Sequence, residues 1–141
     1  IALSDGMFKT GLAAWIATSF VGLFGTPSTV IMVFVVVFLV DFLTEVTSNT
    51  AVTSMMVPVV ISIALKTGEN PITVAVAAAI AASMAFMLPV ATPPNALVYG
   101  TGYVALKDMV RAGLILDVIG WLMTVFVVLV IAGWLWGVVG F

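Results

Sequence analysis

The chain has 141 residues, of which 64% are hydrophobic and only 7% are charged. Soluble domains carry more charge, and the apolar segments do not alternate with polar residues as barrel strands do, so we expect an all-α, multi-pass membrane protein. There is no basic patch, which argues against a nucleic-acid partner, and the absence of Cys and His excludes disulfides, thiol catalysis and histidine chemistry.

The first segment, residues 1–27, is predicted to be an arm helix over 7–24 followed by a linker. Apolar side chains recur in it at spacings of three and four, namely Phe8, Leu12, Trp15, Ile16, Phe20 and Leu23. This amphipathic pattern predicts a helix that lies in the membrane interface, and a short spanning helix is the alternative. Gly25 and Pro27 then break the chain before the next helix begins.

The second segment, residues 28–66, contains two apolar runs on either side of a polar stretch. Each run offers about 15 residues, or roughly 22 Å of helix, which is short of the ~30 Å hydrocarbon core. We therefore predict a re-entrant hairpin whose tip, residues 48–50, lies at membrane depth against protein or water. A plain loop between two short crossings is the alternative. The tip offers hydroxyl and amide groups without fixed charge, which suits a small ion or an anion.

The third segment, residues 71–102, is predicted to be a discontinuous transmembrane helix. Its first part is rich in Ala, and small residues let helices approach each other closely in lipid. Pro89, Pro93 and Pro94 lack N–H groups, so we expect the helix to break at 90–95, with a kinked structural helix as the alternative. The break and the tip would meet at mid-membrane, where free carbonyls coordinate Na⁺ and helix N-termini attract carboxylates.

The last segment, residues 109–137, is long enough to span the membrane with tilt. It carries Asp117, for which we expect Arg111 or a group outside this chain as the partner. In the second segment, Asp41 and Glu45 are four residues apart and therefore lie on one helix face. Two interpretations of this pair stay open. It forms a proton or cation site, or it accepts hydrogen bonds from free backbone near the hairpin tip.

Two motifs resemble the divalent anion/sodium symporter family, the sodium–dicarboxylate cotransporters. The first is Thr-Glu-Val-Thr-Ser-Asn-Thr at 44–50, and the second is Leu-Pro-Val-Ala-Thr-Pro-Pro-Asn-Ala at 88–96. The resemblance has family-like spacing from about residue 28 to 125. It implies the C-terminal half of an inverted-repeat elevator transporter, with the N-terminal repeat as a partner, because this chain holds a single Ser-Asn-Thr motif.

The resemblance also implies which residues bind the substrate and the co-transported Na⁺. The substrate-binding residues would be Ser48, Asn49 and Thr50, with Thr92 and Pro93 across from them. The Na⁺ ligands would be Thr44, Thr47, Asn49 and Ala91. The expected activity is Na⁺-coupled uptake of a dicarboxylate such as succinate, by a homodimer in the cell membrane.

Other functions remain as alternatives. An anion exchanger, or a sulfate or citrate carrier, would use the same fold. An intramembrane enzyme would need a Gly-x-Gly-Asp motif, a Gly-x-Ser-x-Gly motif or a His–Glu pair, and none of these occurs in the sequence. We therefore expect that the protein is not an enzyme. A structural membrane subunit is the last alternative, and the two matched interruptions argue against it.

Overall fold

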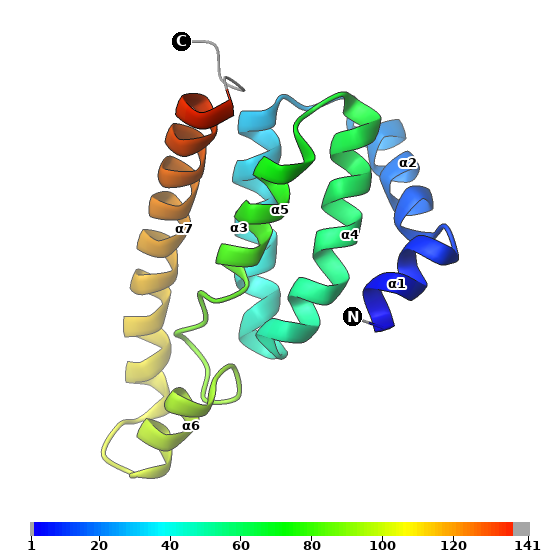
Figure 1. The fold of residues 1–141 in the computed structure, drawn as a ribbon. Helices are drawn as coiled ribbons and strands as arrows, with labels where there is room; N and C mark the ends of the chain where they lie inside the picture. Colours follow the sequence, from blue (N-terminus) through cyan, green and yellow to red (C-terminus); the bar gives the residue numbers. More distant parts are fainter. Residues whose placement is uncertain (1, 137–141) are drawn as a thin grey trace.

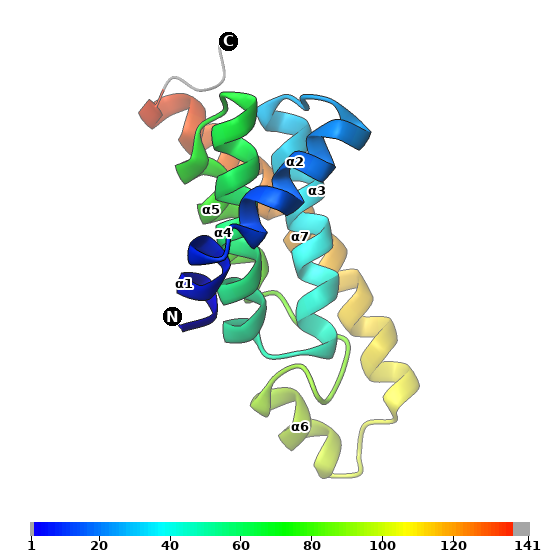
Figure 2. The ribbon, with the colours of Figure 1, turned by 90° about the vertical axis from the view of Figure 1, so that its right-hand side faces the viewer.

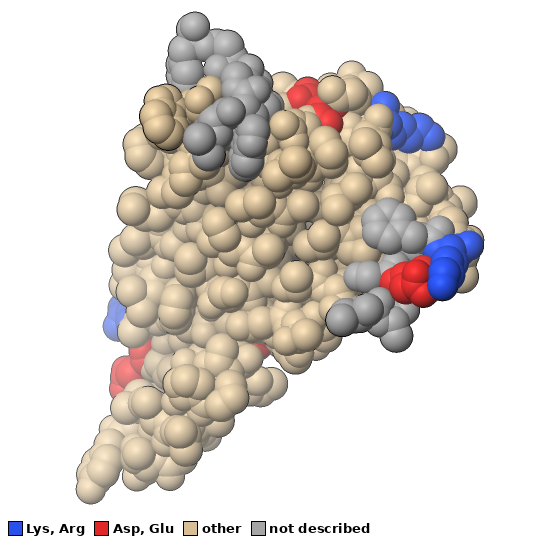
Figure 3. All heavy atoms as spheres, viewed as in Figure 1, with Lys and Arg blue, Asp and Glu red and all other residues tan. Residues whose placement is uncertain are grey.

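The computed structural model describes residues 2–136, and every regular element in this range is an α-helix (Figure 1). The helices are α1 (Ala2–Lys9), α2 (Leu12–Phe24), α3 (Thr29–Val46), α4 (Asn49–Thr67), α5 (Pro71–Ala81), α6 (Pro93–Gly100) and α7 (Leu106–Trp136). Helices α3, α4 and α7 are long and apolar enough to cross a membrane. Uncharged side chains make up most of the face in Figure 3, and charged side chains lie near its edges. The expectation of an all-helical membrane protein is confirmed.

The helices pack around an antiparallel hairpin formed by α3 and α4 (Figure 1). Helix α5 lies against both hairpin helices, α7 packs against α3 and α5, and α1 and α2 pack against α4. The core between them consists of small side chains, including the fully buried Val33, Val37, Val52, Val74 and Ala78. Small residues allow close helix packing, and the Ala-rich helix is buried among its neighbours as predicted.

The arm at the N-terminus differs from the single helix predicted over 7–24. The structure has two helices, α1 and α2, which meet at a sharp turn (Figure 2). Gly11 makes the turn with a φ of +73°, a left-handed conformation that glycine adopts without a steric penalty. The small residues Ala13 and Ala17 of α2 are buried, whereas Trp15 is exposed. The arm therefore turns small side chains toward the hairpin and leaves Trp15 exposed.

The hairpin helices are longer than the apolar runs on either side of the turn. Helix α3 has 18 residues and α4 has 19, which correspond to roughly 27 and 29 Å, so the estimate of about 22 Å for each was too short. Both helices continue through polar residues next to the turn. Ser48 begins α4 by accepting a hydrogen bond from the N–H of Ala51 at 3.2 Å. The length of the helices alone therefore does not require a re-entrant hairpin.

The helix interruption lies earlier than the predicted break at 90–95. Helix α5 ends at Ala81, and α6 begins at Pro93. The irregular chain between them, residues 82–92, is called the interruption below. Pro93 and Pro94 occupy the first positions of α6, where a missing N–H leaves no helical hydrogen bond unmade and the fixed φ suits a helix start. These prolines start a helix and do not end one. Helix α7 also begins at Leu106, three residues before the predicted start.

Candidate functional site

The hairpin turn meets the helix interruption at the hydroxyl of Thr44. This side chain is fully buried, and its Oγ1 lies 2.6 Å from Oδ1 of Asn49 and 2.8 Å from the carbonyl oxygen of Ala82. A hydroxyl has one proton and can donate it to only one of these oxygens at a time. Three polar groups, from α3, α4 and the interruption, converge at this point. Their hydroxyl, amide and carbonyl oxygens are the kind of ligand that a hard cation accepts.

The remaining turn residues surround the start of α4. Thr47 and Ser48 have extended backbone, Asn49 is half-buried, and the side chains of Ser48 and Thr50 are exposed. The first N–H groups of α4 lie at this turn and are not paired within the helix, apart from those that Ser48 satisfies. The positive end of the α4 dipole therefore lies beside hydroxyl and amide groups, which favours a negatively charged ligand.

Two buried carboxyl groups, one from α3 and one from α7, hold neighbouring residues of the interruption. Glu45 of α3 accepts hydrogen bonds from the N–H groups of Met87 at 2.9 Å and Leu88 at 2.8 Å. Asp117 of α7 accepts one from the N–H of Phe86 at 3.3 Å. These N–H groups would otherwise be unpaired in an apolar surrounding, where each would cost several kcal/mol.

These contacts identify the partners of two of the acidic residues. The interpretation that a carboxylate binds free backbone is confirmed for Glu45, although the backbone belongs to the interruption and not to the hairpin tip. The expectation of Arg111 as the partner of Asp117 is wrong, because Asp117 binds the Phe86 backbone and the one ion pair within residues 2–136 joins Lys9 and Asp5. Asp41 is buried, and its Oδ1 has no hydrogen-bond partner among the described residues.

The start of α6 closes the interruption from its far end. Asn95 donates from Nδ2 to the carbonyls of Ala85 at 2.9 Å and Leu88 at 3.1 Å, and Thr92 begins the helix by accepting from the N–H of Asn95 at 3.4 Å. Ala91 is buried, Thr92 is half-buried and Pro93 is exposed. Among the described hydrogen bonds, none joins these three residues to the hairpin turn.

The structure thus brings together part of the predicted Na⁺ ligand set. Thr44 and Asn49 are in contact, whereas Thr47 and Ala91 make no described hydrogen bond to them. The sequence interpretation missed two groups at the interruption, the carbonyl of Ala82 and the side chain of Asn95. Asn95 lies in the second motif and could have been predicted from it. The carbonyl of Ala82 could not, because nothing in an Ala-rich helix distinguishes it from its neighbours.

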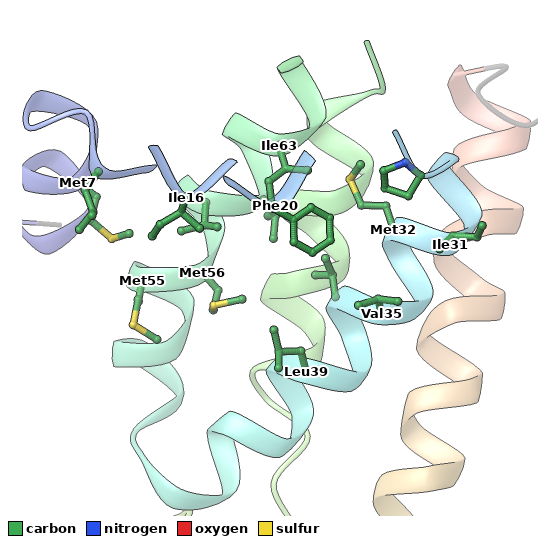
Figure 4. Close-up of a pocket in the computed structure, with 15 residues that line it drawn as sticks. Met7, Ile16, Phe20, Ile31, Met32, Val35, Leu39, Met55, Met56 and Ile63 are labelled. Carbon is green, nitrogen blue, oxygen red and sulfur yellow. The ribbon is translucent and has the colours of Figure 1, made fainter. Parts of the chain in front are cut away.

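A separate cavity of about 440 Å³ lies between the arm and the hairpin (Figure 4). Apolar side chains from α2, α3 and α4 line it, among them Phe20, Met32, Met56 and Ile63. It offers no charged or hydrogen-bonding side chain to a polar solute. A dianionic substrate would be unpaired there, so the hairpin turn and the interruption are the better candidate site.

Comparison with known sequences agrees with this architecture. The sequence profile described as the sodium:sulfate symporter transmembrane region matches residues 1–141. The chain belongs to this family, the divalent anion/sodium symporters. The resemblance seen in the two motifs is confirmed. The family consists of transporters, as its description states, so the expectation that the protein is not an enzyme is confirmed as well.

Similar proteins come from animals and bacteria. Solute carrier family 13 member 2 of Oryctolagus cuniculus is 39% identical over 119 residues, which cover 84% of this chain and 20% of that protein. The sodium-dependent dicarboxylate transporter SdcS of Staphylococcus saprophyticus is 36% identical over 129 residues, or 91% of this chain and 24% of that protein. The Na(+)/citrate cotransporter of Rattus norvegicus is 46% identical over 59 residues, which cover 42% of this chain and 10% of that protein. The chain therefore spans about a quarter of their length or less.

Proposed function

We propose that the chain is the C-terminal repeat of a Na⁺-coupled symporter that takes up a dicarboxylate such as succinate. The observation that carries this proposal is the convergence of Thr44 Oγ1, Asn49 Oδ1 and the Ala82 carbonyl where the hairpin meets the interruption. Support also comes from the names of two similar proteins, which specify sodium together with dicarboxylate or citrate. The other components of the proposal are the N-terminal repeat as partner, a homodimer and the cell membrane.

In this proposal, Na⁺ binds to hydroxyl, amide and carbonyl oxygens at the hairpin turn. Thr44 and Asn49 supply side-chain oxygens, while Thr47 and Ala91 supply carbonyls. Oxygen ligands without fixed charge suit a hard monovalent ion that must be released in each transport cycle. The close contact of Thr44 with Asn49 supports half of this ligand set.

The substrate carboxylates bind beside the ion in this proposal. Ser48, Asn49 and Thr50 provide hydroxyl and amide donors, and Thr92 and Pro93 bind from the side of α6. Ser48 caps the start of α4, and Thr92 caps the start of α6. Their positive dipole ends support the binding of an anion, and the adjacent Na⁺ would neutralise part of its charge.

We also propose that the hairpin is re-entrant, and its depth along α7 supports this. Glu45 and Asp117 bind the neighbouring N–H groups of Met87 and Phe86, so they lie at the same level. Asp117 is six residues after Arg111 (117 − 111), the last charged residue at the start of α7, and so lies roughly 9 Å further into the candidate span. The turn extends only roughly 4 Å beyond Glu45 toward the start of α7 (Figure 1), so it would end within the hydrocarbon core.

The elevator movement in this proposal is a rigid-body shift of the hairpin, the interruption and α7 against a scaffold. The interfacial arm, α1 and α2, would connect the moving unit to that scaffold. The extensive side-chain bonding of the interruption to α3 and α7 supports movement as one unit. The alternative is a citrate or sulfate carrier on the same frame, since the family description names sulfate and one similar protein is named for citrate.

The test is uptake by the whole transporter reconstituted in liposomes, with an inward Na⁺ gradient and labelled succinate, citrate or sulfate outside. We expect succinate uptake that stops when choline replaces Na⁺ and that unlabelled succinate inhibits more strongly than citrate or sulfate does. Uptake of succinate at the same rate with choline would contradict the proposal. Faster Na⁺-dependent uptake of citrate or sulfate would support the alternative carrier.

A further inference from the structure

Helix α7 touches the backbone of the interruption at Gly113. A Cβ atom added to Gly113 would lie 2.4 Å from Cα of Met87 and 2.4 Å from the carbonyl oxygen of Phe86. These neighbours are backbone atoms, so no side-chain rotation relieves the overlap. Any residue other than glycine at position 113 would push this segment away from α7.

One helical turn further along α7, Asp117 binds the same segment. Residues 113 and 117 are four apart and lie on one helix face, and Asp117 Oδ1 accepts the N–H of Phe86 at 3.3 Å. Its carboxyl group is buried, and the other oxygen, Oδ2, has no hydrogen-bond partner among residues 2–136. Gly113 thus provides the space for the Phe86 backbone, and Asp117 satisfies its N–H group.

The same helix contains a glycine that serves as a matched control. Gly120 lies seven residues after Gly113 on a similar face, and a Cβ atom there would come 3.3 Å from Sδ of Met84. Met84 has a flexible side chain that can move by a few tenths of an ångström. Alanine at Gly120 therefore tests the loss of a glycine from α7 without displacing the backbone of the interruption.

We infer that Gly113 and Asp117 are positioning residues for the proposed ion and substrate site. Neither residue is one of the proposed Na⁺ or substrate ligands. They hold the chain at 86–88 against α7, while Glu45 holds the same stretch against α3. Fixing residues 86–88 also fixes the positions of the residues before them, including the Ala82 carbonyl, and of the residues after them, up to the start of α6. The inference rests on the proposed function, because its effect is measured through Na⁺ and substrate.

The experiment uses the whole transporter in liposomes with four variants, Gly113→Ala, Asp117→Ala, Asp117→Asn and Gly120→Ala. For each, we would measure the Na⁺ concentration that gives half-maximal uptake, the KM for substrate and the maximal rate, together with gel filtration of the purified protein. We expect Gly113→Ala to raise both the half-maximal Na⁺ concentration and the KM by about tenfold, because the site is displaced by about an ångström. The maximal rate should change less than either.

The other three variants separate positioning from charge and from helix propensity. Asp117→Ala should change both values in the same direction as Gly113→Ala, whereas Asp117→Asn should stay near the wild type, since an amide oxygen still accepts the Phe86 N–H. Gly120→Ala should also stay near the wild type. A folded Gly113→Ala variant with wild-type values would overturn the inference, and so would an Asp117→Asn variant as impaired as Asp117→Ala.

The two proposals fail in distinguishable ways. If Gly113→Ala is not recovered as a folded protein, the two Asp117 variants test the inference. An impaired Asp117→Ala with a near-wild-type Asp117→Asn supports it, and equal impairment of the two overturns it. Wild-type uptake that ignores Na⁺ would contradict the proposed function. Na⁺-dependent wild-type uptake with unaffected Gly113→Ala and Asp117→Ala variants would contradict only the positioning role.

Discussion

The two ends of the α3–α4 hairpin are built from the same apolar helices but enclose different groups. Away from the turn, on the side that faces the arm, the space between helices is a cavity of about 440 Å³ lined by apolar side chains (Figure 4). At the turn, Thr44 and Glu45 are buried, and their oxygens bind backbone groups of the interruption. The first end contributes packing, and the second holds non-helical backbone in a defined position. Substitutions at the two ends should therefore affect different properties.

The largest effect is expected for Asn49→Ala at the turn. This substitution removes an oxygen that lies 2.6 Å from Thr44 Oγ1 and should abolish Na⁺-dependent uptake of succinate in liposomes while the protein still folds. Asn49→Asp should abolish it too, because it places a negative charge beside an anionic substrate. Asn70→Ala is the matched control, since Asn70 caps α5 at the opposite end of the hairpin. It should lower stability by about 1 kcal/mol and leave uptake Na⁺-dependent. Wild-type uptake by Asn49→Ala would contradict the assignment.

The next effect concerns the support of the interruption by Glu45. Glu45→Ala leaves the N–H groups of Met87 and Leu88 buried without acceptors, at about 1–3 kcal/mol each, and should lower both the thermal stability and the affinity for Na⁺. Glu45→Gln retains one acceptor oxygen and should lie between Glu45→Ala and the wild type. Glu69→Gln, near the other end of α3, should change neither property. A thermal melt in detergent with and without Na⁺ measures this, and equal melting temperatures for Glu45→Ala and the wild type would refute it.

A smaller effect, on stability alone, is expected at the apolar end. Met32 is buried and lines the cavity, so Met32→Ala should cost about 2–5 kcal/mol of stability by enlarging it. The Na⁺ concentration for half-maximal uptake should stay at the wild-type value, because no group at the turn moves. Met32→Leu is the matched control and should cost less than about 1.5 kcal/mol. If Met32→Ala weakened the Na⁺ dependence without lowering the melting temperature, the division between the two ends would be wrong.

The smallest effect is expected in the arm at Gly11. Gly11→Ala places a Cβ in a left-handed conformation and should destabilise the α1–α2 turn by about 1 kcal/mol. Uptake should remain Na⁺-dependent with an unchanged KM. Gly6→Ala, within α1 and with nothing near its added Cβ, should be neutral or slightly stabilising in the same melting experiment. A loss of stability at Gly6 equal to that at Gly11 would show that the turn conformation is not the cause.

The same two ends show how far the sequence predicts this molecule. The polar run at 44–50 located the hairpin turn, because polar residues in an apolar chain mark a special position. The start of the interruption was missed, since Ala82, Met84 and Met87 favour helix and no breaker precedes Pro89. Contacts from Thr44, Glu45 and Asp117, distant in sequence, hold the chain out of a helix there. The turn in the arm was also missed, although Gly11 marks it.

The central claim, that the hairpin turn and the interruption form a Na⁺-dependent substrate site, is tested most directly by thiol labelling at Ser48. This chain has no Cys, so Ser48→Cys introduces a single thiol into it, and Lys66→Cys at the far end of α4 is the matched control. The rate of reaction with a membrane-impermeant reagent is measured with and without Na⁺ and succinate. The account predicts that Na⁺ with succinate slows labelling at Ser48→Cys and leaves Lys66→Cys unchanged. Equal labelling of Ser48→Cys under all conditions would contradict it.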